Sequence, residues 1–155
     1  MSRIRNKIRL LVLHGPNLNL LGEREPEIYG KLTLLQLNSK LRKYVQGDCL
    51  LRIEQSNCEG RMIDKIHKER KWAQAIIINA GAWTHYSYAI RDALTAVALP
   101  TIEVHLSDIQ SREEFRKISV IREVCIAQFY GKGILSYFAA LDHLKSETLF
   151  KKLKR

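Results

Sequence analysis

The fold is decided by the stretch IRLLVLHGPN, residues 8–17, a largely apolar run that meets Gly15 and Pro16. A short apolar run bounded by turn residues predicts a buried β-strand, here over residues 8–14. Four further runs of this kind follow, at residues 49–56, 75–80, 101–107 and 124–131. Continuous apolar strands are typical of parallel sheets covered on both faces, so these runs predict one such sheet.

Segments with helical spacing lie between the predicted strands. In residues 33–45 apolar side chains recur three and four positions apart behind Thr33, a favoured N-cap residue. Helical spacing also marks residues 62–66, 89–97, 111–117 (a short turn) and 133–144. Because strands that alternate with helices run parallel through right-handed crossovers, we expect an α/β fold, a flavodoxin-like three-layer sandwich with a five-stranded parallel sheet.

Length, charge and hydropathy restrict the kind of protein. The chain has 155 residues, 46% of them hydrophobic, which predicts a single domain over residues 1–155. Its formal net charge of +10 is concentrated in basic ends, which we interpret as tails over residues 1–7 and 151–155. No apolar run approaches the ~20 residues of a membrane span and no secretory leader is recognisable, so a cytoplasmic protein without membrane contact is expected.

Metal and nucleotide sites have little support in the sequence. The three cysteines lack C-x-x-C spacing and the five histidines lack the spacing of a metal-binding pair, so no metal is expected. The loop GPNLNLLG, residues 15–22, carries neither the dinucleotide fingerprint nor a P-loop lysine. Two alternatives to an enzyme rest on bulk features alone. The charge of +10 suggests a nucleic-acid-binding module, and the architecture suggests a flavin or nucleotide carrier.

Polar side chains gather where three of the predicted strands end. The first strand is followed by His14 to Asn17, the third by Asn79, Gly81, Thr84 and His85, and the fourth ends in Glu103, His105 and Ser107. In open α/β sheets ligands bind beyond the carboxyl ends of the strands, so this edge is predicted to hold a small-molecule site. The alternative is that these residues only cap helices and form turns.

Two spacings within this set suggest chemistry. Glu103 and His105 stand two apart on a predicted strand and therefore project to one face, where the carboxylate can orient the imidazole and raise its basicity. A purely structural Glu–His pair is the alternative. His85 and Asp92 stand seven apart, a rise of ~10 Å if both lie on one helix. A small ligand does not easily span that distance, so a shared role for both predicts an assembly in which Asp92 reaches a neighbouring site.

Three long motifs resemble those of one family, the type II 3-dehydroquinate dehydratases. They are GPNLNLLGEREPEIYG at residues 15–30, INAGAWTHYSYAIRDAL at 78–94 and PTIEVHLSDIQSREEFR at 100–116. The similarity extends from about Ile8 to Leu144 and keeps the motifs in order at the predicted strand ends. It implies a lyase of the shikimate pathway to chorismate and aromatic amino acids. That enzyme removes water from 3-dehydroquinate by anti elimination through an enolate, without metal, cofactor or Schiff base.

The resemblance also implies roles for individual residues. Residues 22–30, here called the lid segment, carry Tyr29 as the base that removes the C2 proton and Arg24 as the group that stabilises the phenolate and the transition state. A tyrosine hydroxyl stays protonated near neutral pH unless a cation favours the phenolate, which is why an arginine is needed. His105 is the general acid, oriented by Glu103, and Asn17 holds the enolate through a water.

Substrate binding and assembly are implied in the same way. Binding falls to Asn79, His85, Leu106, Ser107 and Arg116, with Asp92 supplied by the adjacent subunit of a dodecamer built from trimers. The sequence departs from the family pattern in the second and third motifs, where NAGAW replaces a commoner NPGAY, and Asp108 and Gln110 replace Asn and His. An acid beside a carboxylate-binding serine is expected to weaken substrate affinity, with otherwise modest effects on loop packing.

Overall fold

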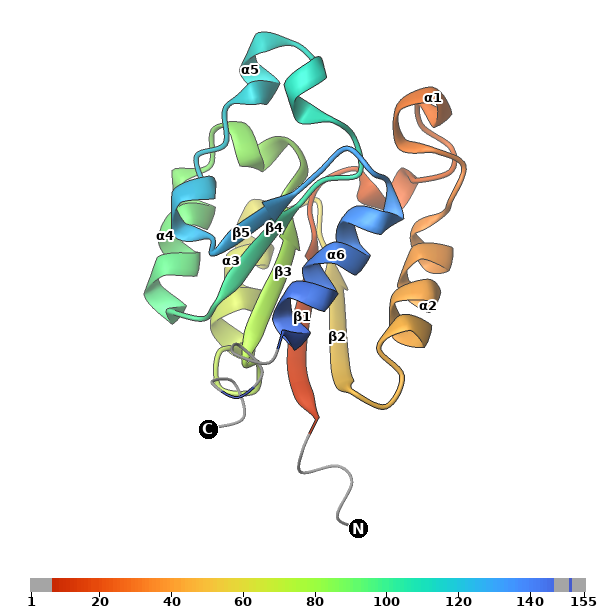
Figure 1. The fold of residues 1–155 in the computed structure, drawn as a ribbon. Coiled ribbons are helices and arrows are strands. Elements are labelled where there is room, and N and C mark those ends of the chain that lie inside the picture. Colours follow the sequence, from red (N-terminus) through yellow and green to blue (C-terminus); the bar gives the residue numbers. More distant parts are fainter. Residues whose placement is uncertain (1–6, 147–150, 152–155) are drawn as a thin grey trace.

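A five-stranded parallel sheet lies between two layers of helices in the computed structural model (Figure 1), which describes residues 7–146 and residue 151. The strands are β1 (Ile8–His14), β2 (Cys49–Gln55), β3 (Ala75–Asn79), β4 (Thr101–Val104) and β5 (Ala127–Phe129). Their order in the sheet is β2-β1-β3-β4-β5 and every neighbouring pair is parallel. This is the flavodoxin-like order, so the predicted fold is confirmed.

The longer helices divide between the two faces of the sheet. Helices α2 (Leu34–Tyr44) and α6 (Ile134–Lys145) cover one face, and α3 (Glu59–Glu69) and α4 (Tyr88–Val97) cover the other (Figure 1). The alternation of β1 explains this division. Leu10 and Val12 are buried in the α2/α6 core, whereas Leu11 and Leu13 are buried in the α3/α4 core. β1 is therefore apolar on both faces, as its sequence predicts.

Helix α2 begins where the sequence predicts. The Thr33 hydroxyl accepts from the backbone N–H of Gln36 at 3.2 Å, and the Gln36 side chain accepts from the N–H of Thr33 at 3.0 Å. The two bonds form a capping box, which satisfies two N–H groups that a helix start leaves open. The preceding lid segment lies above α2, at the same end of the molecule as the carboxyl ends of the strands (Figure 1).

β4 is shorter than predicted and this matters for the site. It ends at Val104 rather than at residue 107. Beyond it, the backbone carbonyl of Ser107 accepts from Gly131 at 3.0 Å, a loop contact in place of a ladder bond. The backbone N–H of His105 still bonds to the carbonyl of Phe129 in β5 at 2.9 Å, and the chain bends at residues 106 and 107, at the carboxyl edge of the sheet.

Two 3₁₀ turns replace regular structure that the sequence predicts. One turn, Arg122–Val124, ends on the first residue of the predicted strand 124–131, and β5 covers only Ala127–Phe129. The other, Gly81–His85, ends before Ser87 caps α4, so His85 and Asp92 do not share a helix. The premise of a common helix, from which the ~10 Å separation was inferred, is therefore wrong.

Smaller elements surround the carboxyl edge. They are α1 (Pro26–Tyr29) within the lid segment, α5 (Glu114–Lys117), and the 3₁₀ turns Leu18–Leu20 and Ile109–Ser111. The predicted basic tails lie outside the described residues except for Lys7 and Lys151. In the described part of the chain no helix is long and apolar enough to cross a membrane. Nor do three or more His, Cys, Asp or Glu side chains gather there in a metal-binding group.

His14, the last residue of β1, is fully buried and neutral. Its Nε2 lies 2.9 Å from Oδ1 of Asn38, and its Nδ1 lies 3.0 Å from the hydroxyl of Tyr137. Burial lowers the pKa of His14 from 6.5 to about 4, against a smaller opposing effect of the hydrogen bond to Asn38. The folded protein therefore resists protonation of this ring, whereas the unfolded chain accepts the proton near pH 6.5.

This difference predicts a pH-dependent loss of stability. Because the pKa is lowered on folding, the stabilisation is complete above about pH 6.5 and is lost as the pH falls towards about 4. Between pH 7.5 and pH 5, His14 should remove roughly 2 kcal/mol from the free energy of unfolding. Chemical denaturation of the unmodified protein and of His14→Asn at both pH values measures it. The variant should lose less stability between the two pH values, and parallel losses would contradict the prediction.

Candidate active site

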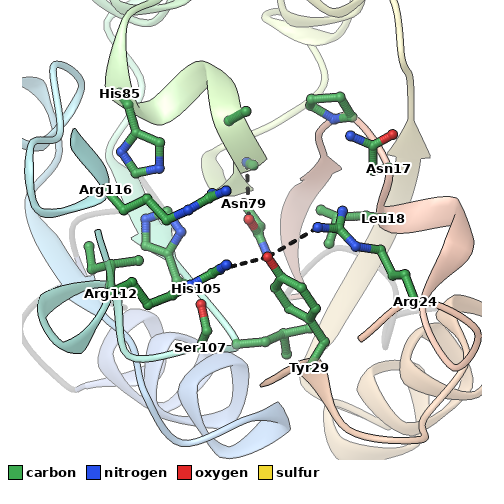
Figure 2. A pocket seen from close by; sticks show the side chains of 15 residues that line it. Asn17, Leu18, Arg24, Tyr29, Asn79, His85, His105, Ser107, Arg112 and Arg116 are labelled. Carbon is green, nitrogen blue, oxygen red and sulfur yellow. Dashed lines mark hydrogen bonds between the residues drawn. The ribbon is translucent and has the colours of Figure 1, made fainter. Parts of the chain in front are cut away.

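A cavity of about 110 Å³ opens at the carboxyl ends of β1, β3 and β4 (Figure 2). Nine of the predicted site residues line it: Asn17, Arg24, Tyr29, Asn79, His85, His105, Leu106, Ser107 and Arg116. Glu103 lies behind His105 rather than in the lining, and Asp92 is an exposed residue of α4 away from the cavity. Arg112 is the functional candidate that the sequence reasoning missed.

Close packing of the strand ends forms the floor of the cavity. A Cβ added to Gly15 would lie 2.4 Å from the carbonyl oxygen of Ala80, so only glycine lets the loop after β1 approach the loop after β3 this closely. The same approach places Pro16 against Gly81. Asn79, the last residue of β3, is thereby enclosed at the base of the site.

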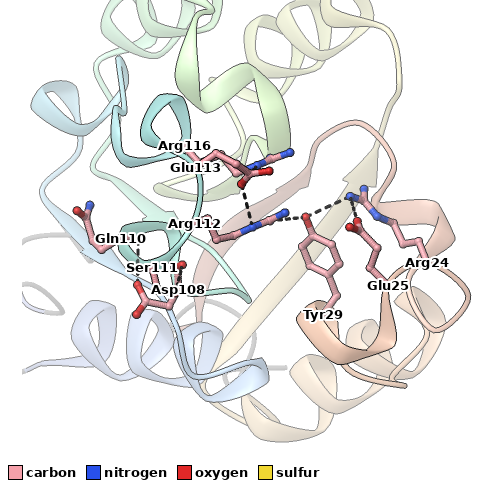
Figure 3. Close-up of polar contacts among 9 residues, drawn as sticks. All are labelled: Arg24, Glu25, Tyr29, Asp108, Gln110, Ser111, Arg112, Glu113 and Arg116. Atoms are coloured by element: carbon pink, nitrogen blue, oxygen red, sulfur yellow. Dashed lines mark hydrogen bonds and ion pairs between the residues drawn. The ribbon is translucent and has the colours of Figure 1, made fainter.

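Two arginines converge on Tyr29, which lies in the lid segment (Figure 3). The hydroxyl oxygen of Tyr29 accepts from Nη2 of Arg24 at 3.1 Å and from Nη1 of Arg112 at 2.7 Å. The two guanidinium carbons also lie 4.4 Å and 5.4 Å from the centre of the tyrosine ring. Hydrogen bonds from cations are stronger when the acceptor is negative, so both guanidinium groups are placed to stabilise negative charge that develops on this oxygen.

Carboxylates hold both arginines in place. Arg24 contacts Glu25 at 3.2 Å, and Glu113 lies 3.6 Å from Arg112 and 2.9 Å from Arg116. Glu25 and Glu113 are exposed side chains at the rim, so each pair contributes little net energy but orients a guanidinium. Glu25, one of the acidic residues of the lid segment, thus has a positioning contact with the arginine beside it.

The lid segment is bent by backbone conformations that few residues adopt. Gly22 has φ of 89°, and a Cβ there would lie 2.9 Å from the Thr33 side chain. Glu25 has φ of 35°, an uncommon left-handed value for a residue with a side chain, directly before the helical turn that Pro26 begins. This turn points Tyr29 into the cavity while leaving most of the segment exposed.

His105 forms a buried pair with Glu103. Its Nε2 lies 2.6 Å from Oε1 of Glu103, and Oε2 of the same carboxylate accepts from the Ser119 hydroxyl at 2.9 Å. Glu103 is fully buried, and the His105 side chain is only 6% exposed. The predicted pairing is confirmed, although His105 lies just beyond the strand. Because a carboxylate only accepts, Nε2 carries the proton and Nδ1 is the second ring position.

His85 lies across the cavity from the lid segment (Figure 2). Its Nδ1 lies 2.7 Å from the backbone carbonyl of Ile118, and its ring meets Phe115 edge to face at 5.7 Å. Burial lowers the pKa of His85, more than the bond to Ile118 raises it. The ring is therefore a neutral hydrogen-bonding group above mildly acidic pH.

The cavity is electropositive. The side chains of three arginines line it, namely Arg24, Arg112 and Arg116 (Figure 2). Guanidinium groups keep their charge at all ordinary pH values and bind carboxylates well, so the cavity suits a small anionic ligand. Arg112 has an extended backbone before α5, and Arg116 lies within that helix, so the two arginines reach the cavity from different local structures.

Asp108 and Gln110, where the sequence departs from the pattern of the family that it resembles, do not line the cavity. Oδ1 of Asp108 accepts from the backbone N–H of Gln110 at 2.9 Å and so caps the short 3₁₀ turn Ile109–Ser111 (Figure 3). The carboxylate of Asp108 is thus engaged in local structure.

Comparison with known proteins agrees with this geometry. The model of the family described as dehydroquinase class II matches residues 8–145. A 3-dehydroquinate dehydratase of Pelotomaculum thermopropionicum is 51% identical over 136 residues, covering 86% of this chain and 94% of the relative. That of Dictyoglomus turgidum is 55% identical, covering 87% of this chain and 94% of the relative.

Solved structures give the same answer. The type II dehydroquinase of Butyrivibrio crossotus superimposes with a TM-score of 0.88 at 45% identity, over 90% of this chain and 99% of that one. The type II dehydroquinase of Propionibacterium acnes gives 0.86 at 39% identity, over 95% of this chain and 99% of that one. A sequence match across nearly the whole described chain, joined to the same fold, leads to one conclusion: the chain belongs to the class II dehydroquinase family.

Proposed function

We propose that the cavity carries out the reaction of this family, the dehydration of 3-dehydroquinate to 3-dehydroshikimate in the shikimate pathway, with Tyr29 as base and His105 as acid. The observation that carries this assignment is the pair of guanidinium hydrogen bonds to the Tyr29 hydroxyl inside a cavity that also holds the Glu103-backed His105. No observation of the described residues favours the alternatives of a nucleic-acid-binding module or a flavin carrier.

In the first step Tyr29, as phenolate, removes a proton from C2 of the substrate. The electron pair of the C–H bond moves into the neighbouring ketone and forms an enolate. Arg24 and Arg112 hold the phenolate before this step, because each donates to its oxygen and neither can lose its own proton. Asn17 lines the cavity and stabilises the enolate oxygen through a water.

In the second step the enolate collapses and the C1 hydroxyl leaves as water. His105 gives the departing oxygen a proton, and the new double bond joins C1 to C2. Glu103 accepts the other ring proton of His105 at 2.6 Å and stabilises the imidazolium before it gives up its proton. Tyr29 comes from the lid segment and His105 from the end of β4, so base and acid act from separate elements, as anti elimination needs.

The remaining lining residues bind the substrate. Its carboxylate is assigned to the region of Leu106 and Ser107, where the backbone leaves β4, within the field of the three cavity arginines. Asn79, His85 and Arg116 are assigned to the polar groups of the ring. The lyase needs no metal or cofactor for these steps, because each proton transfer has a side chain assigned to it.

The site is proposed to be completed by a neighbouring copy of the chain. Four large side chains in or next to the segments that carry His85 and Arg116 are more than half exposed: Tyr86 (60%), Tyr88 (64%), Phe115 (53%) and Ile118 (60%). Phe115 and Ile118 both contact His85 of the cavity lining, and exposed apolar groups are typical of protein contacts. Asp92 is exposed on the same helix as Tyr88. We assign this face to the trimers of a cytoplasmic dodecamer, with Asp92 reaching the adjacent cavity.

The catalytic roles can be tested by steady-state kinetics with 3-dehydroquinate. The unmodified protein should produce the ultraviolet absorbance of a conjugated enone. Tyr29→Phe should lower kcat by about 10²–10⁴-fold, the usual contribution of a general acid or base. Arg112→Met should lower it by about 10²–10³-fold, as expected for the loss of one charge-stabilising donor. Circular dichroism should show an intact fold in both. Tyr44→Phe and Arg42→Met remove the same groups away from the cavity and should retain activity. Near-normal turnover in Tyr29→Phe would refute its role as the base.

The shared site can be tested by mixing two impaired variants. Asp92→Ala and Tyr29→Phe are each unfolded, combined and refolded together. If Asp92 acts in the adjacent cavity, some mixed sites combine an intact Tyr29 with an intact Asp92, and activity should exceed that of either variant refolded alone. Analytical ultracentrifugation should find one large assembly in each case. A monomer, or a mixture no more active than its parts, would contradict the assignment.

A further inference from the structure

The end of β2 and the turn after it carry two amide side chains that the proposed mechanism does not use, Gln55 and Asn57. Gln55 is the last residue of β2 and stands opposite His14, the last residue of β1, in the parallel register. Neither amide lines the cavity. Both nevertheless contact the loop that leads from β1 into the cavity and carries Asn17.

Two backbone groups of that loop are bonded to these amides. Nε2 of Gln55 donates to the backbone carbonyl of Gly15 at 3.2 Å, and Oδ1 of Asn57 accepts from the backbone N–H of Asn17 at 2.8 Å. The amides also bond to each other, because Nε2 of Gln55 donates to Oδ1 of Asn57 at 3.0 Å. The three bonds form a continuous bridge from Gly15 to Asn17.

The backbone groups at the two ends of this bridge fix the orientation of both amides. A carbonyl only accepts, so Gln55 turns its nitrogen towards Gly15, and a backbone N–H only donates, so Asn57 turns its oxygen towards the loop. Every bond of the bridge then pairs a donor with an acceptor. A further contact of the Gln55 nitrogen, with Oδ1 of Asn19, is 3.5 Å long and is the weakest.

Asn17 has an uncommon backbone conformation. Its φ of 66° and ψ of −3° lie in the left-handed region, which few residues with a side chain adopt. Asn17 stands where the 3₁₀ turn Leu18–Leu20 begins, yet its side chain does not cap that turn. An asparagine at the start of a helical turn commonly does so, and here the amide instead lines the cavity.

Both peptide planes next to the Asn17 Cα are held by hydrogen bonds. On one side its N–H donates to Asn57, and on the other its carbonyl accepts from the backbone N–H of Leu20 at 3.0 Å. Together these bonds resist rotation about φ and ψ. Without the bond to Asn57, the peptide plane before Asn17 could turn and φ could relax to a commoner negative value. The side chain would then leave the loop in a different direction.

We propose that Gln55 and Asn57 are positioning residues, which hold Asn17 in its left-handed conformation and so keep its amide directed at the place where the enolate forms. This assignment rests on the proposed function, because it takes Asn17 as the residue that stabilises the enolate. An enolate develops only as the C2 proton is removed. A misplaced Asn17 should therefore slow the chemical step and leave substrate binding nearly unchanged.

The test is a double-mutant cycle with Asn57→Ala and Asn17→Gly, assayed with 3-dehydroquinate. Glycine adopts the left-handed conformation readily, so Asn17→Gly removes the amide without straining the loop. Asn57→Ala should lower kcat by roughly 10–100-fold, as expected for a misplaced group, with KM within about three-fold. In the Asn17→Gly background the same change should not lower kcat further, because the group that it positions is gone.

Two further variants separate positioning from a general loss of structure. Asn57→Asp keeps an oxygen that can accept both bonds, so it should restore most of the kcat that Asn57→Ala loses. Asn19→Ala is the matched control. It removes an amide from the same loop, together with the weakest contact of the Gln55 nitrogen, and should keep both kinetic constants.

The outcomes separate this inference from the proposed function. An unmodified protein that does not turn over 3-dehydroquinate refutes the function itself. An active enzyme whose Asn57→Ala variant keeps its kcat, or loses as much kcat with and without the Asn17 amide, overturns the positioning role. If Asn57→Ala does not fold, Gln55→Met decides, because it removes the donor at the other end of the bridge. It should lower kcat and keep KM, and an unchanged kcat would overturn the proposal.

Discussion

The site depends on the convergence of two guanidinium groups on one phenolic oxygen, that of Tyr29. Arg24 reaches it from within the lid segment and Arg112 from the loop after β4, so the contact joins two parts of the chain that are 83 residues apart. The same interaction therefore closes the cavity and makes the oxygen suited to negative charge. Glu25 and Glu113 orient the two arginines from the rim of the cavity. Because both glutamates are exposed to solvent, their ion pairs are weak and leave most of the positive charge of the arginines available to Tyr29.

Behind this contact the chemistry rests on buried polar groups, each with an assigned partner. Glu103 lies between His105 and Ser119, and His14 lies between Asn38 and Tyr137. A buried polar group costs free energy when it has no hydrogen-bond partner, and a fully paired network of such groups is rigid. These pairs therefore fix the side chains at the base of the cavity. The strand ends supply this rigid half of the site, and the lid segment supplies the exposed half.

Local patterns predicted most of the fold from the sequence. The apolar runs identified all five strands, and Thr33 identified the start of α2, because burial and capping leave signals within a few residues. Strands β4 and β5 were predicted too long. Where they end depends on backbone hydrogen bonds in the loops, such as that between Ser107 and Gly131, and such bonds leave no trace in the pattern of apolar residues. Nine site residues gather as expected, but Arg112 was missed. Its partner Tyr29 is 83 residues away, and no local pattern encodes such a contact.

The central claim is that Tyr29 and His105 act on opposite sides of the substrate ring, the base taking the C2 hydrogen that stands anti to the C1 hydroxyl. It is tested most directly with two samples of 3-dehydroquinate, deuterated at C2 either anti or syn to that hydroxyl, and with mass spectrometry of the product. The account predicts that the anti label is lost to solvent and the syn label is kept in 3-dehydroshikimate. Loss of the syn label, or equal loss of both, would contradict it.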